Sequence, residues 1–429
     1  MFAKPLNRAK EIYHEYPRQF WVVIGASFVD HLGGALLFTF FSLYVTQHFG
    51  VGMTEVGILF AIFSISEFFG SMFGGALTDQ IGRKSVIIIG LVVSALTSVG
   101  MGLVNKLELF YLMAVITGLF ADMAGPARQA MLTDLLPEEK HADGFGIMRV
   151  VMNLSVAIGP AIGGFLAAQS YLLLFGADAV SSVITAIAFY FLVAETLPQA
   201  KTEEDKEEKI SFADSFRGYL IVLKDRAFIL FMGISMIVTI VYMQMYGALP
   251  VFLRDVHNIP EAGFGMIMSL NATMVVLLQF AITRKMGKRP PMLMMALGAI
   301  IYAIGFSMYG FVNEYAMFML AMVIITIGEM VVTPVAQALV AKFSPEEMRG
   351  RYMAVFGISW LIPGAIGPLL AGLIMDNGDP RWVWYASGIL AIIATLGFLY
   401  LHKHVEQDEE SVSPVDIEPA PLMATKEAA

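Results

Sequence analysis

The sequence predicts an all-α membrane protein, with twelve transmembrane helices arranged as two pseudo-symmetric six-helix bundles around a central cavity. Of the 429 residues, 57% are hydrophobic and 15% are charged, whereas soluble domains carry about 25% charged residues. Apolar stretches of about 20 residues, the length that crosses a bilayer, recur along the chain. A segment of the first half is also repeated in the second half.

The apolar stretches divide into two groups of six, separated by one long polar connection. We predict helices at 20–46, 55–78, 84–104, 108–133, 144–168, 171–194, 227–253, 260–283, 290–312, 316–341, 351–375 and 382–402. The predicted domains are an N-terminal bundle (1–194), a Lys- and Glu-rich linker (195–226), a C-terminal bundle (227–402) and an acidic tail (403–429). We expect the tail to be disordered, because it lacks the apolar residues that form a core.

The repeat relates the end of one six-helix group to the end of the other. Residues 126–164 recur without a gap as residues 334–372, with 11 identities in 39 positions. Duplicated halves are typical of membrane transporters in which one half moves against the other around a central site.

Basic residues are divided unevenly between the alternate loops. If the N-terminus lies inside, the inner segments hold 22 Lys and Arg residues and the outer loops hold 3. Because Lys and Arg concentrate in cytoplasmic loops, both termini and the linker are predicted to be cytoplasmic. We therefore expect a multi-pass protein of the cell membrane (inner or plasma membrane), whose N-terminal segment is retained because it has no small-residue cleavage site.

A polar motif of defined spacing lies between the second and third stretches. Residues 75–84 read Gly-Ala-Leu-Thr-Asp-Gln-Ile-Gly-Arg-Lys, in which Gly82 permits a tight turn. Residues 282–289, in the matching loop of the second half, carry a degenerate copy. The motif resembles the signature of the major facilitator superfamily, G-x-L-x-D-x-x-G-R-K, at every defined position. The chain is identified as a member of that family, similar to its twelve-helix bacterial drug:proton antiporters.

This resemblance implies a gate at the cytoplasmic ends of the helices. In the family, the acid that corresponds to Asp79 is thought to cap the eleventh helix. The base that corresponds to Arg83 is thought to pair with an acid at the inner end of the fourth helix, here Asp134. With Gly82, these residues would hold the cytoplasmic side closed in the outward-facing state. The alternative is that the charges only fix the topology.

The fifth stretch carries a second signature. Residues 155–164 resemble the family's antiporter motif, g-x-x-x-G-P-x-x-G-G, with Ser155 in place of the first glycine. Proline bends a helix, and glycine lets neighbouring backbones approach closely. The predicted bend residues, including those of the repeat copy, are Gly159, Pro160, Gly163, Gly164, Gly367 and Pro368. The motif favours exchange over symport, and packing alone is the alternative.

Five carboxylates lie within the predicted spans: Asp30, Glu67, Asp122, Asp178 and Glu329. A carboxylate at the bilayer centre costs about 2.5–3.5 kcal/mol, so each needs a partner or a function. An acid that binds either a proton or a cation provides a minimal exchange mechanism. Because the fourth helix has no base in its middle, we predict that Arg149 of the fifth helix supplies the positive charge.

Glu329 is the strongest candidate for proton coupling and substrate binding. It lies in a segment that resembles the corresponding helix of Gram-positive multidrug/proton antiporters, where the acid takes part in cation recognition and proton coupling. Asp122 lies near the equivalent place in the fourth stretch. The alternative for both acids is a structural hydrogen bond to a neighbouring helix.

The other acids have weaker patterns. Asp30 is followed by His31, with which it would form a proton relay, and Glu67 lies on a helix with a small-residue face. A structural role is the alternative for both. Asp178 lies near the outer end of the sixth stretch, where we expect it to reach interfacial water.

The second half contains many soft and aromatic side chains. Methionine adapts its shape and aromatic rings attract organic cations, so these side chains suit the binding of varied compounds. We predict that Tyr242, Gln244, Tyr246 and Asn271 line the substrate cavity. Ordinary packing is the alternative.

The leading function is therefore a secondary active transporter that exports amphipathic, cationic small molecules in exchange for protons by alternating access. The alternative is a carrier for one hydrophilic metabolite, such as a sugar, an organic acid or a siderophore. An enzyme is not expected, because the zinc motif H-E-x-x-H and the ATP-binding loop are absent. We expect no cofactor, no metal site and no nucleic-acid partner, since the chain has no cysteine and no basic stripe. The expected partners are the substrate, protons and the bilayer, with the protein as a monomer.

Overall fold

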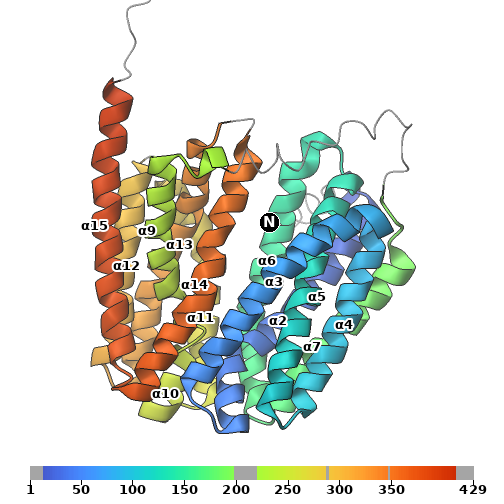
Figure 1. Ribbon diagram of the computed structural model, residues 1–429, viewed down its shortest axis with the longest axis horizontal. Helices are drawn as coiled ribbons and strands as arrows, with labels where there is room; N and C mark the ends of the chain where they lie inside the picture. Colours follow the sequence, from blue (N-terminus) through green and yellow to red (C-terminus); the bar gives the residue numbers. More distant parts are fainter. Residues whose placement is uncertain (1–12, 198–219, 287–288, 346–347, 412–429) are drawn as a thin grey trace, which may run out of the picture.

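The computed structural model describes residues 13–197, 220–286, 289–345 and 348–411. Those residues form helices without any strand, and twelve of the helices are long and apolar enough to cross a membrane (Figure 1). The predicted fold class is confirmed.

Each half contains six of these helices. The N half consists of α2 (Arg18–Phe49), α3 (Met53–Ile81), α4 (Arg83–Leu103), α5 (Leu107–Leu135), α6 (His141–Ala167) and α7 (Tyr171–Leu192). The C half consists of α9 (Arg226–Met243), α11 (Glu261–Met286), α12 (Pro291–Phe311), α13 (Tyr315–Phe343), α14 (Arg349–Asn377) and α15 (Trp382–Ser411), with the short helix α10 (Leu249–His257). The 3-10 turn η1 (Glu138–Lys140) directly precedes α6. Most predicted stretches coincide with one helix to within a few residues.

The seventh stretch is the exception. One continuous helix over 227–253 was predicted, but α9 ends at Met243 and α10 begins at Leu249. The Gln244 carbonyl accepts hydrogen bonds from the Ala248 and Leu249 amides, at 3.2 and 2.9 Å. Pro250 has no N–H to donate, so it is accommodated in the first turn of a new helix. The hydropathy profile does not reveal this break, because the broken segment is as apolar as the helices that flank it.

The predicted disordered tail is wrong for its first residues, because α15 continues to Ser411. Residues 403–411 are mostly good helix formers, such as Lys, Glu and Gln, that extend a helix already begun in the apolar span. The rest of the predicted tail lies outside the described residues, as do residues 198–219 of the linker and the first 12 residues.

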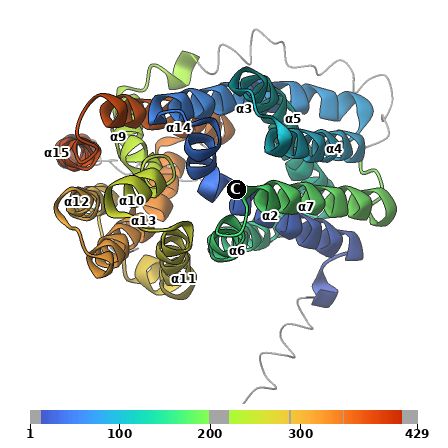
Figure 2. The same cartoon turned by 90° about the horizontal axis from the view of Figure 1, so that it is seen from below.

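The halves meet along two seams, one between α3 and α14 and the other between α6 and α11 (Figure 2). Glycine makes the close approach possible in both seams. A Cβ atom at Gly372 would lie 2.3 Å from the Met53 carbonyl oxygen, and one at Gly164 would lie 3.3 Å from the Gly265 Cα atom. Only glycine permits backbones to pack at the first of these separations.

The two faces of the molecule differ in how the halves are arranged. We call the face at which α2 begins and α15 ends the terminal face, and the other the opposite face. The halves converge at the opposite face, around α10, and diverge toward the terminal face (Figure 1).

Candidate functional site

The Glu329 carboxylate is held by two neutral hydrogen-bond donors from other helices of the C half. The Tyr242 hydroxyl of α9 donates to Oε1 at 3.0 Å, and the Asn271 amide of α11 donates to Oε2 at 2.8 Å. Asn271 is itself oriented by the Thr326 hydroxyl, 3.0 Å away. In the described part of the chain, no Lys, Arg or His lies within 4.0 Å of this carboxylate. A charge in this position is therefore open to compensation by a proton or a cation.

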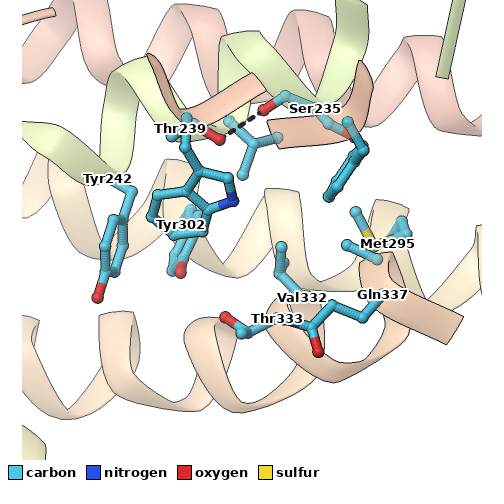
Figure 3. A pocket seen from close by; sticks show the side chains of 12 residues that line it. Ser235, Thr239, Tyr242, Met295, Tyr302, Val332, Thr333 and Gln337 are labelled. Atoms are coloured by element: carbon cyan, nitrogen blue, oxygen red, sulfur yellow. Dashed lines mark hydrogen bonds between the residues drawn. The ribbon is translucent and has the colours of Figure 1, made fainter. Parts of the chain in front are cut away.

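A small aromatic cavity lies next to this carboxylate. This C-half cavity, of about 40 Å³, is lined by the rings of Tyr242, Tyr302, Phe356 and Trp360, among others. Figure 3 shows that Tyr242 and Tyr302 lie on one side of it and that Thr333 and Gln337 lie across from them. Because Tyr242 also bonds Glu329, the carboxylate is linked directly to the wall of this cavity.

A larger cavity of about 510 Å³ lies between the halves. This central cavity is lined by Phe38, Phe60, Phe63, Ser64, Glu67, Phe68 and Ser71 of the N half and by Met243, Ala354, Gly357, Ile358, Trp360, Leu361 and Gly364 of the C half. Trp360 lines both the central cavity and the C-half cavity. The predicted cavity between two bundles therefore exists, and its aromatic walls extend toward Glu329.

The four residues predicted to line the substrate cavity do not all line the same cavity. Tyr242 lines the C-half cavity, while Asn271 is 4% exposed and acts by holding Glu329. Tyr246 packs its ring against Phe38 across the interface, with 5.6 Å between centroids. Gln244 differs from its prediction: it is buried and donates to the carbonyls of Ile240 and Gly367, at 2.9 and 3.0 Å. Its place beside the break after α9 explains this, because the break brings its amide against α14.

Asp30 of α2 pairs with Arg128 of α5, a partner that sequence reasoning missed. The Arg128 guanidinium donates to Oδ2, and the Ser182 hydroxyl of α7 donates to Oδ1 at 3.3 Å. The predicted relay to His31 is secondary, because its Nδ1 lies 4.0 Å from the same carboxylate, beyond hydrogen-bond range. Asp30 is an ion-paired acid within the N half.

Among the described contacts, Arg149 forms no ion pair with an acid of the N half. Its guanidinium donates to the Gln337 side chain of α13, across the interface and at the edge of the C-half cavity. Arg128 was overlooked because it lies beyond the middle of the fourth helix, where its guanidinium nevertheless reaches Asp30.

Two further acids line a third cavity, of about 220 Å³, inside the N half. Glu67 lies between this N-half cavity and the central cavity and lines both. Asp178 lines the N-half cavity and is 9% exposed, so the expectation that it reaches interfacial water is wrong. Asp122 lies in α5, but its side chain is outside the described residues.

The motif residues form a cluster at the terminal face. Arg83 donates to Asp134 and to Asp79, at 3.1 Å in both cases, and Gly82 has a positive φ of 97°. Asp79 keeps 75% of its side chain exposed, and the partner described for it belongs to its own half. The predicted contact between Asp79 and the start of the eleventh membrane helix, α14, is therefore not among its described contacts.

Sequence reasoning missed Glu195 in this cluster. Its carboxylate accepts the backbone amides of Arg83 and Lys84 at the start of α4, at 2.9 and 3.2 Å. Its neighbour Thr196 donates to Asp134 at 3.0 Å. An acid just after the sixth helix, on the same face as the motif loop, was the available signal.

Cross-half bonds close the opposite face. Asp376 of α14 accepts the Met53 and Thr54 amides at the start of α3, at 2.8 and 2.7 Å, and the Thr54 hydroxyl at 2.6 Å. A carboxylate at a helix N-terminus is favoured by the unpaired amides there and by the helix dipole. Tyr171 of α7 also joins the two halves, because it donates to Glu261 of α11 at 2.8 Å.

Arg254 of α10 adds a permanent charge to this closure. It donates to the Leu43 carbonyl at 3.2 Å and to the Thr46 hydroxyl at 3.0 Å. Partial burial alone would lower the pKa of Arg254, but the hydrogen bond and charge of Asp255 outweigh this and raise it. These contacts therefore persist across the physiological pH range.

The bend residues serve packing within and between the halves. α6 and α14 remain continuous helices through Pro160 and Pro368. Gly159 and Gly163 face α2, where a Cβ atom would lie 2.7 Å from Ala35 and from Phe40, respectively. Gly164 faces α11, and the Gly367 carbonyl accepts the Gln244 amide. In the described part of the chain, no three His, Asp or Glu side chains are grouped closely enough to hold a metal ion.

The sequence matches the family model described as Major Facilitator Superfamily over residues 23–334 and 294–427. The chain belongs to this superfamily. It is a multi-pass membrane transporter of small molecules and not an enzyme.

Similar proteins include antiporters and multidrug resistance proteins. The chain is 27% identical over 407 residues to a Na⁺, Li⁺, K⁺/H⁺ antiporter of Planococcus maritimus, covering 89% of this chain and 94% of that protein. It is 24% identical over 373 residues to the multidrug resistance protein MdtH of Shigella flexneri, covering 85% and 89%. Among solved structures, a POT family transporter in complex with a thioalcohol-conjugated peptide is 18% identical with a TM-score of 0.74, covering 91% of this chain and 97% of that one. That likeness shows the superfamily fold.

Proposed function

We propose that this transporter is an antiporter that exports amphipathic cationic small molecules in exchange for protons, with Glu329 as the group that binds the two in turn. The observation that carries the proposal is the Glu329 carboxylate, held by two neutral donors beside an aromatic cavity. A neutral surrounding leaves the charge uncompensated, so a proton and a substrate cation compete for it.

The side chains around Glu329 suit both states of such an exchange. Tyr242 and Asn271 each occupy one carboxylate oxygen, so they keep the group in place whichever ligand is bound. The rings of Tyr242, Tyr302 and Trp360 offer faces that attract organic cations. The names of the relatives, an antiporter and a multidrug resistance protein, support the proposal.

Alternating access supplies the direction of transport. We propose that the terminal face is cytoplasmic, which makes this conformation inward-facing, with the opposite face closed by Asp376 and Arg254. The cluster of Asp79, Arg83 and Asp134 would then close the cytoplasmic side in the outward-facing state. Proton entry releases about 2.3 kcal/mol per 100 mV of membrane potential, enough to drive export against a gradient. We further propose that the protein works as a monomer in the cell membrane.

The test is cation-driven proton movement in proteoliposomes that contain the purified protein and a trapped pH dye. Tetraphenylphosphonium added outside the vesicles should drive protons out of the lumen through the wild type, toward the side on which the cation was added, and Glu329→Gln should abolish this exchange. Glu314→Gln is the matched control, because Glu314 is an exposed acid just before α13, the helix that carries Glu329. Unchanged coupling in Glu329→Gln would contradict the assignment.

Exchange of alkali cations for protons is a second candidate, favoured by the name of the Planococcus relative. The same vesicles distinguish the two, because Na⁺, Li⁺ or K⁺ replaces tetraphenylphosphonium as the driving cation. A response to the alkali cations without one to tetraphenylphosphonium would assign the second function.

A further inference from the structure

Five aromatic side chains of the C half form a closed circuit at the opposite face. Ring centroids lie 5.0 Å apart between Phe252 and His257 of α10, and 4.6 Å apart between His257 and Phe318 of α13. Tyr309 of α12 follows, 5.8 Å from Phe318. Trp384 of α15 lies 5.1 Å from both Tyr309 and Phe252 and completes the circuit. We call these five residues the aromatic clamp, because they hold α10 against three other helices.

His257 is the member of the clamp that gains a charge near neutral pH. The other four members are fully buried, so they shield the imidazole from water on their sides. The Nε2 atom of His257 is buried, and in the part of the chain that the structure describes no hydrogen-bond partner reaches it. Protonation would therefore place an unpaired positive charge among aromatic rings, and burying a charge without a partner is costly.

The acids at this end of the surrounding helices do not compensate such a charge. They are Asp255 of α10, Glu261 of α11, Glu314 just before α13, Asp376 of α14 and Asp379 before α15. Among the described residues, no Asp or Glu oxygen lies within 4.0 Å of a His257 nitrogen. The bases at this end are His48 of α2, Arg254 of α10 and Arg381 before α15, and they repel a further positive charge. The tyrosines, Tyr309 among them, stay neutral near pH 7.

The clamp favours the neutral form of His257. Burial lowers the pKa of His257, and the positive charge of Arg381 lowers it further. When α10 leaves the clamp, the imidazole returns to water and to its ordinary pKa of about 6.5. The released imidazole therefore binds a proton more tightly than the clamped one. The clamp is most stable above about pH 6.5, and it loses stability as the pH falls below this value toward the lowered pKa.

The clamped helix also carries the arginine that joins the two halves at this face. Arg254 lies one turn before His257, and it donates to the Leu43 carbonyl and the Thr46 hydroxyl of α2, at 3.2 and 3.0 Å. Figure 1 shows α10 where the halves converge. Because α10 has only 9 residues, its release from the clamp would move Arg254 with it and break both bonds to α2.

We infer that His257 is a proton-operated latch: a proton bound on the side of the opposite face releases α10 from the aromatic clamp, withdraws Arg254 from α2 and opens that face. The step adds one proton to the imidazole and changes no other covalent bond. This inference goes beyond the proposed function, because it concerns the opening of a face and not the transported cation. Its role in the cycle rests on the proposed function: an acid outer solution would favour the outward-facing state, in which Glu329 takes up its proton.

The test is the distance between two spin labels on the full-length protein in lipid nanodiscs, without a transported cation. Because the chain has no cysteine, the labels are placed on cysteines introduced at Lys106 and Glu314, which are exposed at the opposite face in different halves. The fraction of molecules with a long distance should rise about threefold or more from pH 7.5 to pH 5.5, since one proton shifts an equilibrium by at most about tenfold per pH unit. A fraction that stays constant or falls at pH 5.5 would overturn the inference.

Two neutral replacements of His257 show whether this residue is the sensor. His257→Phe keeps an aromatic ring in the clamp but binds no proton, so the short distance should persist at both pH values. His257→Gln gives the same expectation and keeps the test valid if His257→Phe fails to fold. His48→Phe is the matched control, because His48 is an exposed histidine of the same face, and it should keep the full response. A response that survives in the His257 variants, or that is lost equally in His48→Phe, would refute the latch.

Glu329→Gln separates the latch from the proposed function. Because the latch does not use Glu329, the response to pH should change less than twofold in this variant. A response kept in Glu329→Gln and lost in His257→Phe supports the latch even if exchange of cations for protons fails. A response lost in Glu329→Gln and kept in His257→Phe would assign the opening to Glu329 and refute the latch.

Discussion

The two halves of this transporter share one fold and one repeated segment, yet the acids within their membrane helices have different kinds of partner. In the N half, Asp30 is paired with the Arg128 guanidinium and a serine hydroxyl. In the C half, Glu329 is held by a tyrosine and an asparagine, both neutral. The first arrangement compensates the charge with a base, and the second, among the described contacts, holds it with neutral donors only.

The comparison extends to the seams between the halves. The repeat places Gly164 and Gly372 at equivalent positions, and each lies in a seam with the other half. The α14–α3 seam is much tighter than the α6–α11 seam at these positions, because the nearest backbone atoms would lie 2.3 and 3.3 Å from an added Cβ atom. Asp376 also bridges the tighter seam. The halves are therefore symmetric in fold and asymmetric in how firmly each seam is closed.

Removing the base of the N half tests the difference between the two acids and should have the largest effect. Arg128→Leu leaves the Asp30 carboxylate, whose side chain is 16% exposed, without its basic partner, and breaking a buried ion pair in this way costs about 3–5 kcal/mol. We expect a large drop in the thermal unfolding midpoint of the purified protein, mostly reversed by adding Asp30→Asn. Arg226→Leu, at an exposed arginine, is the control. If Arg128→Leu had the same unfolding midpoint as Arg226→Leu, the ion-pair assignment would be refuted.

The bonds of Asp376 can be removed to test whether they hold the opposite face closed. Asp376→Ala loses three hydrogen bonds across the α14–α3 seam, and bonds to a charged group contribute about 1.5–3 kcal/mol each. Because the chain has no cysteine, spin labels can be placed on cysteines introduced at Lys106 and Asn313 alone.

The distance between these labels should shift to longer values in Asp376→Ala. Asp379→Ala is the matched control, because the Asp379 carboxylate accepts only a local amide, that of Arg381, among its described contacts. The gate assignment fails if both variants keep the wild-type distance.

Substitutions at the equivalent glycines, Gly372 and Gly164, test whether the two seams differ in how closely they pack. Gly372→Ala forces a Cβ atom against the Met53 backbone, a steric overlap of the kind that costs about 1–3 kcal/mol, whereas Gly164→Ala needs an adjustment of only a few tenths of an ångström. The same label pair should report an opened opposite face for Gly372→Ala and little change for Gly164→Ala. Equal responses would show that the two seams are equivalent.

The smallest effect is expected for Tyr242→Phe, which removes one neutral donor from Glu329 and leaves the other. One such hydrogen bond contributes about 1 kcal/mol, so the concentration of cation that half-saturates exchange should rise about fivefold. Tyr309→Phe is the control, because the Tyr309 hydroxyl is buried without a hydrogen-bond partner in the described part of the chain. A complete loss of exchange in Tyr242→Phe would mean that the tyrosine itself carries the proton.

The sequence determined the twelve helices, the duplicated halves and the superfamily, because each follows from patterns that are local or regularly repeated. Apolar length sets where a helix crosses the membrane, and the signature loop is contiguous. The sequence also singled out Glu329 as a candidate, because it is a carboxylate in an apolar stretch and because that stretch resembles the corresponding helix of Gram-positive multidrug/proton antiporters.

Only the tertiary structure decided which groups meet. Asp30 and Arg128 are 98 positions apart, and Asp376 and Thr54 are 322 apart, so no spacing rule connects them. The burial of Asp178 in a cavity of five helices, and the break that turns Gln244 into a packing residue, depend likewise on how the helices lie against one another. Hydropathy fixes the depth of a residue in the membrane, whereas helix rotation and packing decide which neighbour it faces.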